Sequence, residues 1–145
     1  MRLTSLFVLS ACLLTPLLAQ ATTSGNLIKG SQPSVYYLGQ DQKRHAFPNE
    51  QVYKSWYTDF SEVRTISDQE LATYSLGANV TYKPGTRLVK IATDPKVYAV
   101  ARGGVLRWVE SENIAQTLYG SQWARQVDDI PDSFFSNYRV GEPIR

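Results

Sequence analysis

The sequence offers few side chains that could carry out catalysis or hold a metal ion. His45 is the only histidine and Cys12 the only cysteine among the 145 residues. A nucleophilic serine or cysteine site needs a base that a third group orients, and a zinc site needs several histidine or cysteine ligands. Arg107 holds the position of His45 in a second, similar part of the chain, which suits an exposed strand better than a catalytic base. We therefore expect no metal and no cofactor.

Paired carboxylates are the other chemistry that the sequence could support, because a glycosidase needs only two acids at a defined separation. The candidate pairs are Asp59 with Glu62, Asp68 with Glu70, and Asp128 with Asp129. However, Asp68 falls at the expected start of a short helix, as does Asp132, and acids are common there because they cap helices. We predict that the protein is not an enzyme. A small secreted hydrolase that uses carboxylates is the alternative.

The first 21 residues have the pattern of a secretory signal. Arg2 provides the positive start, a mostly apolar run extends from residue 3 to residue 18, and Ala19-Gln20-Ala21 supplies the small residues of a cleavage site. The run is too short for a transmembrane helix, which needs about 20 apolar residues, and Pro16 interrupts it. We predict that residues 1–21 are removed on export, which leaves a secreted or cell-envelope protein without a transmembrane segment.

A lipid anchor at Cys12 is the alternative mode of processing. The residues Leu9-Ser10-Ala11 before it match the small-residue pattern that precedes the lipid-bearing cysteine of bacterial lipoproteins. Against this, the residues after Cys12 stay apolar up to Leu18, whereas a lipoprotein usually becomes polar there to form a tether. Cleavage after Ala21 removes the only cysteine, so the mature chain has no disulfide and depends on burial for its stability.

The remainder of the chain contains the same pattern of residues twice. The matching pairs keep their order, and their offset rises from 61 to 64 residues: Leu27-Ile28-Lys29 with Leu88-Val89-Lys90, Val35-Tyr36 with Val97-Tyr98, Asn49-Glu50 with Ser111-Glu112, Phe60 with Trp123, Ile66 with Ile130, and Leu76-Gly77 with Val140-Gly141. Repetition at such a period is typical of tandem structural units. We predict two homologous copies, residues 22–84 and 85–145, which the short linker at Lys83-Pro84-Gly85 keeps packed together.

Each copy is predicted to contain a β-hairpin backed by a short helix. Turn residues, Gly39-Gln40-Asp41-Gln42 and Ala101-Arg102-Gly103-Gly104, separate strand-like runs at 34–38 and 43–47, and at 96–100 and 105–109. Helices are expected at 50–57 and 112–119, with Asn49 and Ser111 as N-caps and Gly120 as a C-cap. Further strands are expected at 26–29, 87–91 and 63–66, and short helices at Ser67-Asp68 and Pro131-Asp132. The fold class is therefore α+β and rich in β-structure.

The aromatic residues divide into those that recur in both copies and those that do not. Recurring ones, such as Tyr36 with Tyr98, are expected in the core, because both copies build the same fold. Non-recurring aromatics next to polar groups suit a platform for sugars or peptides. The candidate binding residues, which include the basic pair at the hairpins, are Tyr37, His45, Tyr53, Tyr82, Arg107 and Trp108. The alternative is that Tyr37, Tyr53, Tyr82 and Trp108 fill the interface between the copies.

Both copies resemble an uncharacterised repeat module of bacterial exported and cell-envelope proteins. The residues that carry the resemblance are Leu27-Ile28-Lys29-Gly30-Ser31, Val35-Tyr36-Tyr37, Lys43-Arg44-His45-Ala46-Phe47-Pro48-Asn49, Trp56, Ile66-Ser67-Asp68, Leu71 and Leu76-Gly77, with Leu106-Arg107-Trp108-Val109 in the second copy. The resemblance implies an accessory or envelope role and brings no catalytic residues. Many members of the module have a bulky residue at the position of Ala46, and the second copy has Trp108 there. Ala46 therefore departs from the module.

The sequence as a whole favours a protein that works by contact. Its formal charge is +2, with acids and bases scattered along the chain. The chain lacks a basic stripe of the kind that binds nucleic acid. We expect a non-catalytic secreted or envelope module that binds a cell-wall polymer, a glycan or a surface protein. The third hypothesis is a purely structural spacer, in which the two copies would share no groove.

Overall fold

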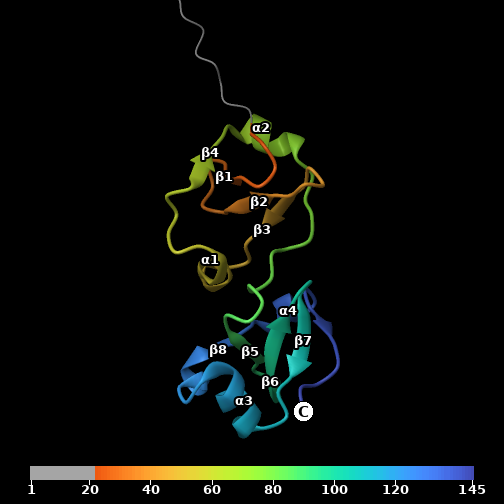
Figure 1. The fold of residues 1–145 in the computed structure, drawn as a ribbon. Coiled ribbons are helices and arrows are strands. Elements are labelled where there is room, and N and C mark those ends of the chain that lie inside the picture. Colours follow the sequence, from red (N-terminus) through yellow and green to blue (C-terminus); the bar gives the residue numbers. More distant parts are fainter. Residues whose placement is uncertain (1–21) are drawn as a thin grey trace, which may run out of the picture.

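The computed structural model describes residues 22–145, which form two β-sheets with short helices (Figure 1). The first sheet has the order β3-β2-β1-β4 and contains β1 (Leu27–Lys29), β2 (Tyr36–Leu38), β3 (Arg44–Ala46) and β4 (Val63–Thr65). The second has the order β8-β5-β6-β7-β9 and contains β5 (Leu88–Ile91), β6 (Asp94–Ala101), β7 (Val105–Trp108), β8 (Val127–Asp129) and β9 (Arg139–Val140). The predicted signal segment and Cys12 lie outside the described residues.

The four helices that the sequence predicts are present, together with one 3₁₀ helix that was not predicted. They are α1 (Glu50–Trp56), α2 (Asp68–Thr73), α3 (Glu112–Tyr119), α4 (Asp132–Phe135) and a 3₁₀ helix, η1 (Trp123–Gln126). The N-caps are confirmed, because the side chain of Asn49 accepts the N–H of Val52 and that of Ser111 accepts the N–H of Ile114. Gly120 ends α3 with φ +83°, a conformation that favours glycine. The predicted α+β, β-rich fold class is confirmed.

The two sheets pair their strands at the positions that the sequence repeat matches. In the first sheet, β1 pairs antiparallel with the β2–β3 hairpin on one side and parallel with β4 on the other. In the second sheet, β5 pairs in the same way with the β6–β7 hairpin and with β8. The corresponding residue pairs are Ile28–Tyr36 with Val89–Tyr98, Tyr36–Ala46 with Tyr98–Trp108, and Arg44–Leu76 with Leu106–Val140. This is a correspondence of topology and register. Descent of both halves from one ancestral unit stays a prediction.

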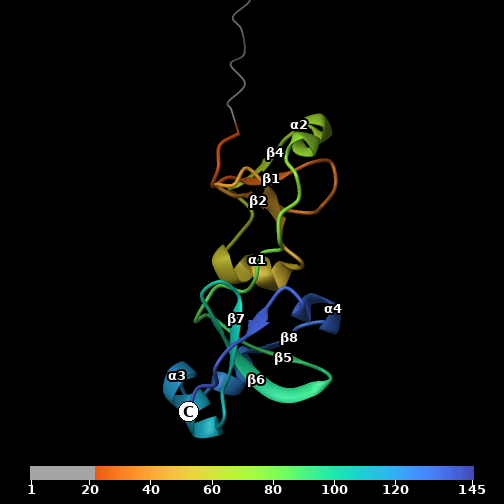
Figure 2. The same cartoon turned by 90° about the vertical axis from the view of Figure 1, so that its right-hand side faces the viewer.

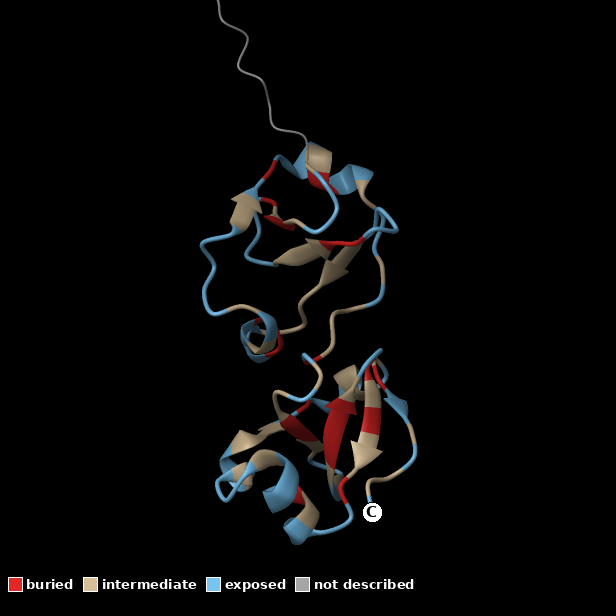
Figure 3. Ribbon diagram, viewed as in Figure 1, coloured by how far each residue is buried: buried red, intermediate tan, exposed pale blue. Residues whose placement is uncertain are grey.

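The two halves are stacked in the same orientation, head to tail. Figures 1 and 2 show the succession α2, first sheet, α1, α4, second sheet and α3 along the molecule. Successive strand residues face opposite sides of a sheet, so Leu88 packs toward α3 while Val89 packs in the cluster that includes α4. Figure 3 shows buried segments on β5, β6 and β7 of the second sheet. Both faces of that sheet are therefore covered.

The contact between the halves is apolar and centred on the linker. Tyr82 is only 2% exposed and belongs to the same buried cluster as Val52 of α1 and Val89 of the second sheet. The N–H of Tyr82 donates to the hydroxyl of Tyr138 at 3.2 Å. Burial raises the pKa of the Tyr82 hydroxyl, and the carboxylate of Asp128 raises it further. The halves thus pack together, as the short linker predicts.

Some elements differ from the sequence-based expectations. Strand β6 begins at Asp94, earlier than predicted, because Asp94 pairs with Ile91 beyond a register shift. Strand β9 was not predicted, since a two-residue edge strand has no alternating pattern of its own. Pro131 is the residue before α4 rather than its first residue.

Replacing Tyr82 with alanine should strongly destabilise the protein. The change removes a buried ring at the contact between the halves, and losses of large aromatic side chains from a core cost about 3–5 kcal/mol. Urea unfolding followed by circular dichroism measures the free energy of unfolding. Leu118→Ala is the control, because Leu118 is 52% exposed and its loss should change stability by at most about 0.5 kcal/mol. A similar small loss for Tyr82→Ala would contradict the packing described.

Stability should also fall at alkaline pH because of Tyr98. Burial, together with the hydrogen bond that its hydroxyl donates to Asp94 at 2.7 Å, raises the pKa of Tyr98 from 10.0 to about 12. The folded state holds this proton more tightly than the unfolded chain. The stabilisation is therefore complete below pH 10 and is lost as the pH rises through 12, a change on the order of 1–3 kcal/mol. The free energy of unfolding, measured across this pH range, should decline less steeply for Tyr98→Phe than for the unchanged protein. Identical slopes would refute the assignment of this pH dependence to Tyr98.

Candidate functional site

Each half contains a groove at the start of the helix that follows its hairpin. The cavity volume is about 350 Å³ in the first half and about 250 Å³ in the second. Each residue that lines the first groove has its repeat counterpart in the second: Pro33 and Pro95, Ser34 and Lys96, Val35 and Val97, Phe47 and Val109, Pro48 and Glu110, Asn49 and Ser111, Glu50 and Glu112, Tyr53 and Ala115, and Phe60 and Trp123. We call these the helix-start grooves.

Aromatic rings line both helix-start grooves. In the first groove, Phe60 stacks on Tyr53 with ring centres 4.3 Å apart and stays 45% exposed. In the second groove, Trp108 and Trp123 are both partly exposed, and the ammonium group of Lys96 lies 5.2 Å from the centre of the Trp108 ring. A ring beside polar groups suits a flat ligand with both apolar and polar faces.

A third groove lies where the halves meet, and we call it the junction groove. Its cavity volume is about 440 Å³. The residues that line it are Tyr37, Phe47, Trp56, Tyr57, Asn79, Val80, Thr81, Pro84 and Gly103. Trp56 is 40% exposed, and its indole N–H donates to the carbonyl of Thr81 at 2.8 Å. This volume is within the range of roughly 300–1,000 Å³ that small-molecule sites occupy.

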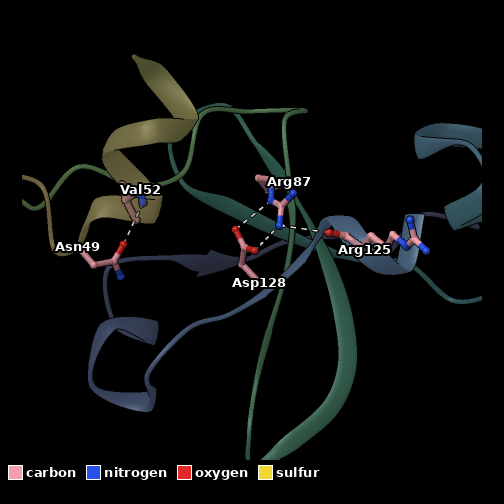
Figure 4. A network of polar contacts seen from close by, with 5 residues as sticks. All are labelled: Asn49, Val52, Arg87, Arg125 and Asp128. Atoms are coloured by element: carbon pink, nitrogen blue, oxygen red, sulfur yellow. Dashed lines mark hydrogen bonds and ion pairs between the residues drawn. The ribbon is translucent and has the colours of Figure 1, made fainter. Parts of the chain in front are cut away.

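A polar cleft lies between α1 and the second sheet. Its volume is about 670 Å³, and the charged groups that line it pair with one another. Lys54 binds Glu50 at 2.7 Å. Figure 4 shows Arg87 held against both carboxylate oxygens of Asp128, and this hydrogen bonding raises the pKa of the Arg87 guanidinium. The cleft therefore has little unpaired charge with which to attract an ionic ligand.

The structure separates the four aromatic binding candidates into two groups. Tyr37 is partly exposed and lines the junction groove, and Trp108 is partly exposed at the second helix-start groove. Tyr53 and Tyr82 are 1% and 2% exposed. Tyr82 fills the contact between the halves, which is the alternative that the sequence left open. Tyr53 lies inside the first half, where its hydroxyl donates to the carbonyl of Asp59 at 2.7 Å.

The two basic candidates occupy equivalent positions and hold equivalent segments. The Nδ1 atom of His45 lies 2.7 Å from the carbonyl oxygen of Ala78. Arg107 donates through Nε to the carbonyl of Glu142 at 2.9 Å, and Glu142 is the repeat counterpart of Ala78. Asp41 lies 3.1 Å from the Nε2 atom of His45, and this contact lowers the pKa of the Asp41 carboxyl. His45 and Arg107 thus each hold the segment that follows the last strand pairing of their own half.

The carboxylates considered for hydrolysis have local partners. Hydrogen bonds from Ser61 lower the pKa of Asp59, and hydrogen bonds from Ser31 lower the pKa of Asp68. A general acid needs a raised pKa instead, so these contacts suit turns and helix starts. Between residues 22 and 145, no three histidine, cysteine or acidic side chains are close enough to hold a metal ion.

The sequence analysis did not include Phe60 and Trp123 among the binding candidates, because recurring aromatics were expected in the core, whereas both line the helix-start grooves. It also missed Trp56. Its repeat counterpart is Leu118, so it satisfies the same rule of non-recurrence that singled out Tyr37. That signal could have found it. Nothing in the sequence, however, indicates that Pro84 and Gly103 approach its ring, because they come from the linker and from the other half.

Comparisons with protein-family models, with curated proteins and with solved structures find no match to this chain. The resemblance to a repeat module of envelope proteins therefore stays a prediction. In the part of the chain that the structure describes, none of the helices has the length and apolar character needed to cross a membrane.

Replacing Arg107 with alanine should release the C-terminal segment. The side chain binds the carbonyls of Glu142 and Pro143, and the N–H of Ile144 donates to the carbonyl of Trp108 at 2.8 Å. We expect the amide of Ile144 to exchange with solvent at least about tenfold faster, since the loss of charged hydrogen bonds costs roughly 1.5–3 kcal/mol. NMR hydrogen exchange measures this. Arg102→Ala, in the exposed β6–β7 turn, is the control, and equal exchange in both variants would contradict the role of Arg107.

Proposed function

We propose that the protein is a non-catalytic secreted or cell-envelope module that binds an envelope polymer, a glycan or a surface protein. The observation that carries the proposal is the recurrence of the helix-start groove: every position that lines the first groove has its counterpart in the second, which Trp108 lines in addition. A spacer needs no groove, and two unrelated halves would not produce one at the same positions. The proposed location rests on the predicted export signal at residues 1–21.

The exposed rings support binding by contact. Phe60 and Trp123 occupy the same position in the two grooves and remain partly exposed, although each belongs to an aromatic or apolar cluster. Rigid rings of this kind supply a large contact area and lose little side-chain entropy on binding. Two such grooves in one chain can engage a repeating polymer at two points, which raises the overall affinity.

The two helix-start grooves differ in charge, so they need not bind the same part of a ligand. The first is bordered by Ser34 and Pro48, whereas the second has Lys96 and Glu110 at these positions. Glu110 in turn binds Arg145 at 3.2 Å. A polymer with alternating units, or two different ligands, would fit this asymmetry.

Pull-down of the mature protein on isolated cell wall, purified glycans and surface protein tests the proposal. We expect retention on one of these materials. Phe60→Ala and Trp123→Ala should each weaken it severalfold, and the double variant by about tenfold or more, because each ring contributes more than 1 kcal/mol when buried by a ligand. Leu76→Ala is the control, since Leu76 is 63% exposed and lines neither groove. No retention on any material, or full retention of the folded double variant, would refute the proposal.

A further inference from the structure

Trp56 stands at the meeting point of two adjoining hollows. The junction groove lies on one side, and a smaller hollow of about 270 Å³ lies on the other; both are lined by Trp56 and Tyr57. The smaller hollow adds polar groups, namely Asp59, Ser61 and Glu62. An exposed indole thus separates a mostly aromatic surface from a surface rich in oxygen acceptors.

The ring of Trp56 is held in place before any ligand arrives. Its N–H is bound to the carbonyl of Thr81 at 2.8 Å, and the neighbouring Ser55 hydroxyl accepts the N–H of Lys83 at 2.9 Å. These two bonds join the end of α1 to the segment from Thr81 to Lys83. A platform that is fixed and yet 40% exposed loses little freedom on binding.

Two tyrosines bring hydroxyl groups to the same place. Burial raises the pKa of the Tyr57 hydroxyl, and the charges of Tyr37 and Glu62 raise it further. Tyr37 and Tyr57 both line the junction groove, and Tyr57 also lines the smaller hollow. Both are therefore available to a ligand as donors and acceptors.

We infer that the junction groove and its adjoining hollow bind a neutral oligosaccharide that stacks on Trp56. A sugar ring has an apolar face for the indole and hydroxyl groups that donate to Asp59 and Glu62 and exchange hydrogen bonds with Tyr37 and Tyr57. The inference deepens the proposed contact function and rests on it, because it names a ligand class for one further site.

The hydrogen-bonding groups distinguish a sugar from a proline-rich peptide, which also binds aromatic grooves. Such a peptide presents carbonyl acceptors and few N–H donors, so its groove must supply donors. Here the indole N–H of Trp56 is already bound to Thr81, and the amide of Asn79 donates to Asn137 at 3.4 Å, so the Tyr37 and Tyr57 hydroxyls are the main donors that remain. The carboxylates of Asp59 and Glu62 can only accept. This inventory suits a ligand rich in hydroxyl donors.

The charges favour a neutral ligand over an anionic polymer. Asp59 and Glu62 line the smaller hollow, while the ammonium group of Lys83 lies 6.0 Å from the centre of the Trp56 ring and interacts with its face. A phosphate-rich or carboxylate-rich chain would meet like charges at the acidic side of the site.

The site exists only because the halves pack together. The β6–β7 turn contributes Gly103, with φ +71°, and the linker contributes Pro84. At Gly104 a side chain would meet the methyl group of Thr81 at 3.0 Å, so this turn approaches the linker closely. The repeat counterpart of Trp56 is Leu118, and the helix-start grooves do not include Trp56. The junction site is thus separate from the two recurring ones.

The three tryptophans of the chain allow a direct test, because each indole N–H gives its own NMR signal. Trp56 reports on the junction site, whereas Trp108 and Trp123 report on the second helix-start groove. The mature protein is titrated with chitotetraose, cellotetraose and maltotetraose, and in parallel with polyphosphate and a proline-rich peptide. We expect one of the tetrasaccharides to shift the Trp56 signal and to leave the other two in place.

Variants then identify the groups that bind. Trp56→Ala should weaken the affinity by about tenfold or more, Trp56→Phe less, since it keeps a ring, and Glu62→Gln severalfold. Leu118→Ala is the matched control, because Leu118 is the repeat counterpart of Trp56 and is 52% exposed, and this variant should bind the sugar normally. A shift of Trp108 or Trp123 alone would overturn the junction site and leave the proposed contact function standing, as would a Trp56 shift caused only by the peptide or by polyphosphate. No shift with any tetrasaccharide would also overturn it, while the wall, glycan and protein pull-down decides the broader function separately.

Discussion

The burial of Tyr82 between the two halves is the interaction on which the rest of the structure depends. Its ring lies in a cluster with Val52 from α1 and with Val89 and Tyr98 from the second sheet. Tyr82, which directly precedes the linker, is therefore part of the core of the second half. Because α1 contributes Tyr53 to the first half and Val52 to this cluster, one helix packs on both halves and sets their relative position.

Both the polar cleft and the junction groove follow from that contact. The cleft is bordered by α1 on one side and by Arg87 and Asp128 of the second half on the other. The junction groove is formed by Trp56, the linker and the β6–β7 turn. Neither hollow could exist in a single isolated half. The helix-start grooves, in contrast, belong to each half by itself and recur for that reason.

Small differences between the halves determine which surfaces remain available. Leu106 is fully buried in the second sheet, and its counterpart in the first is Arg44, whose guanidinium lies 5.2 Å from the ring centre of Tyr36. The cluster on this face of the first sheet is accordingly smaller than that of the second, which also receives Tyr82 and Val52. The two halves share one topology but differ in what covers them. The first half packs on the second, whereas the α1 end of the first half contributes the rings of the junction groove.

Local signals in the sequence were sufficient for the elements of each half. The caps at Asn49, Ser111 and Gly120 depend on hydrogen bonds to residues three or four positions away, so they can be read without knowing the fold. The hairpins were predicted from their turn residues, and the structure shows that their registers match at the repeated positions. Only the tertiary structure decided that Tyr82 is buried while Trp56 is exposed, although both are aromatic residues of the first half. Their exposure is set by long-range packing of one half on the other, and this packing leaves no periodic pattern in the chain.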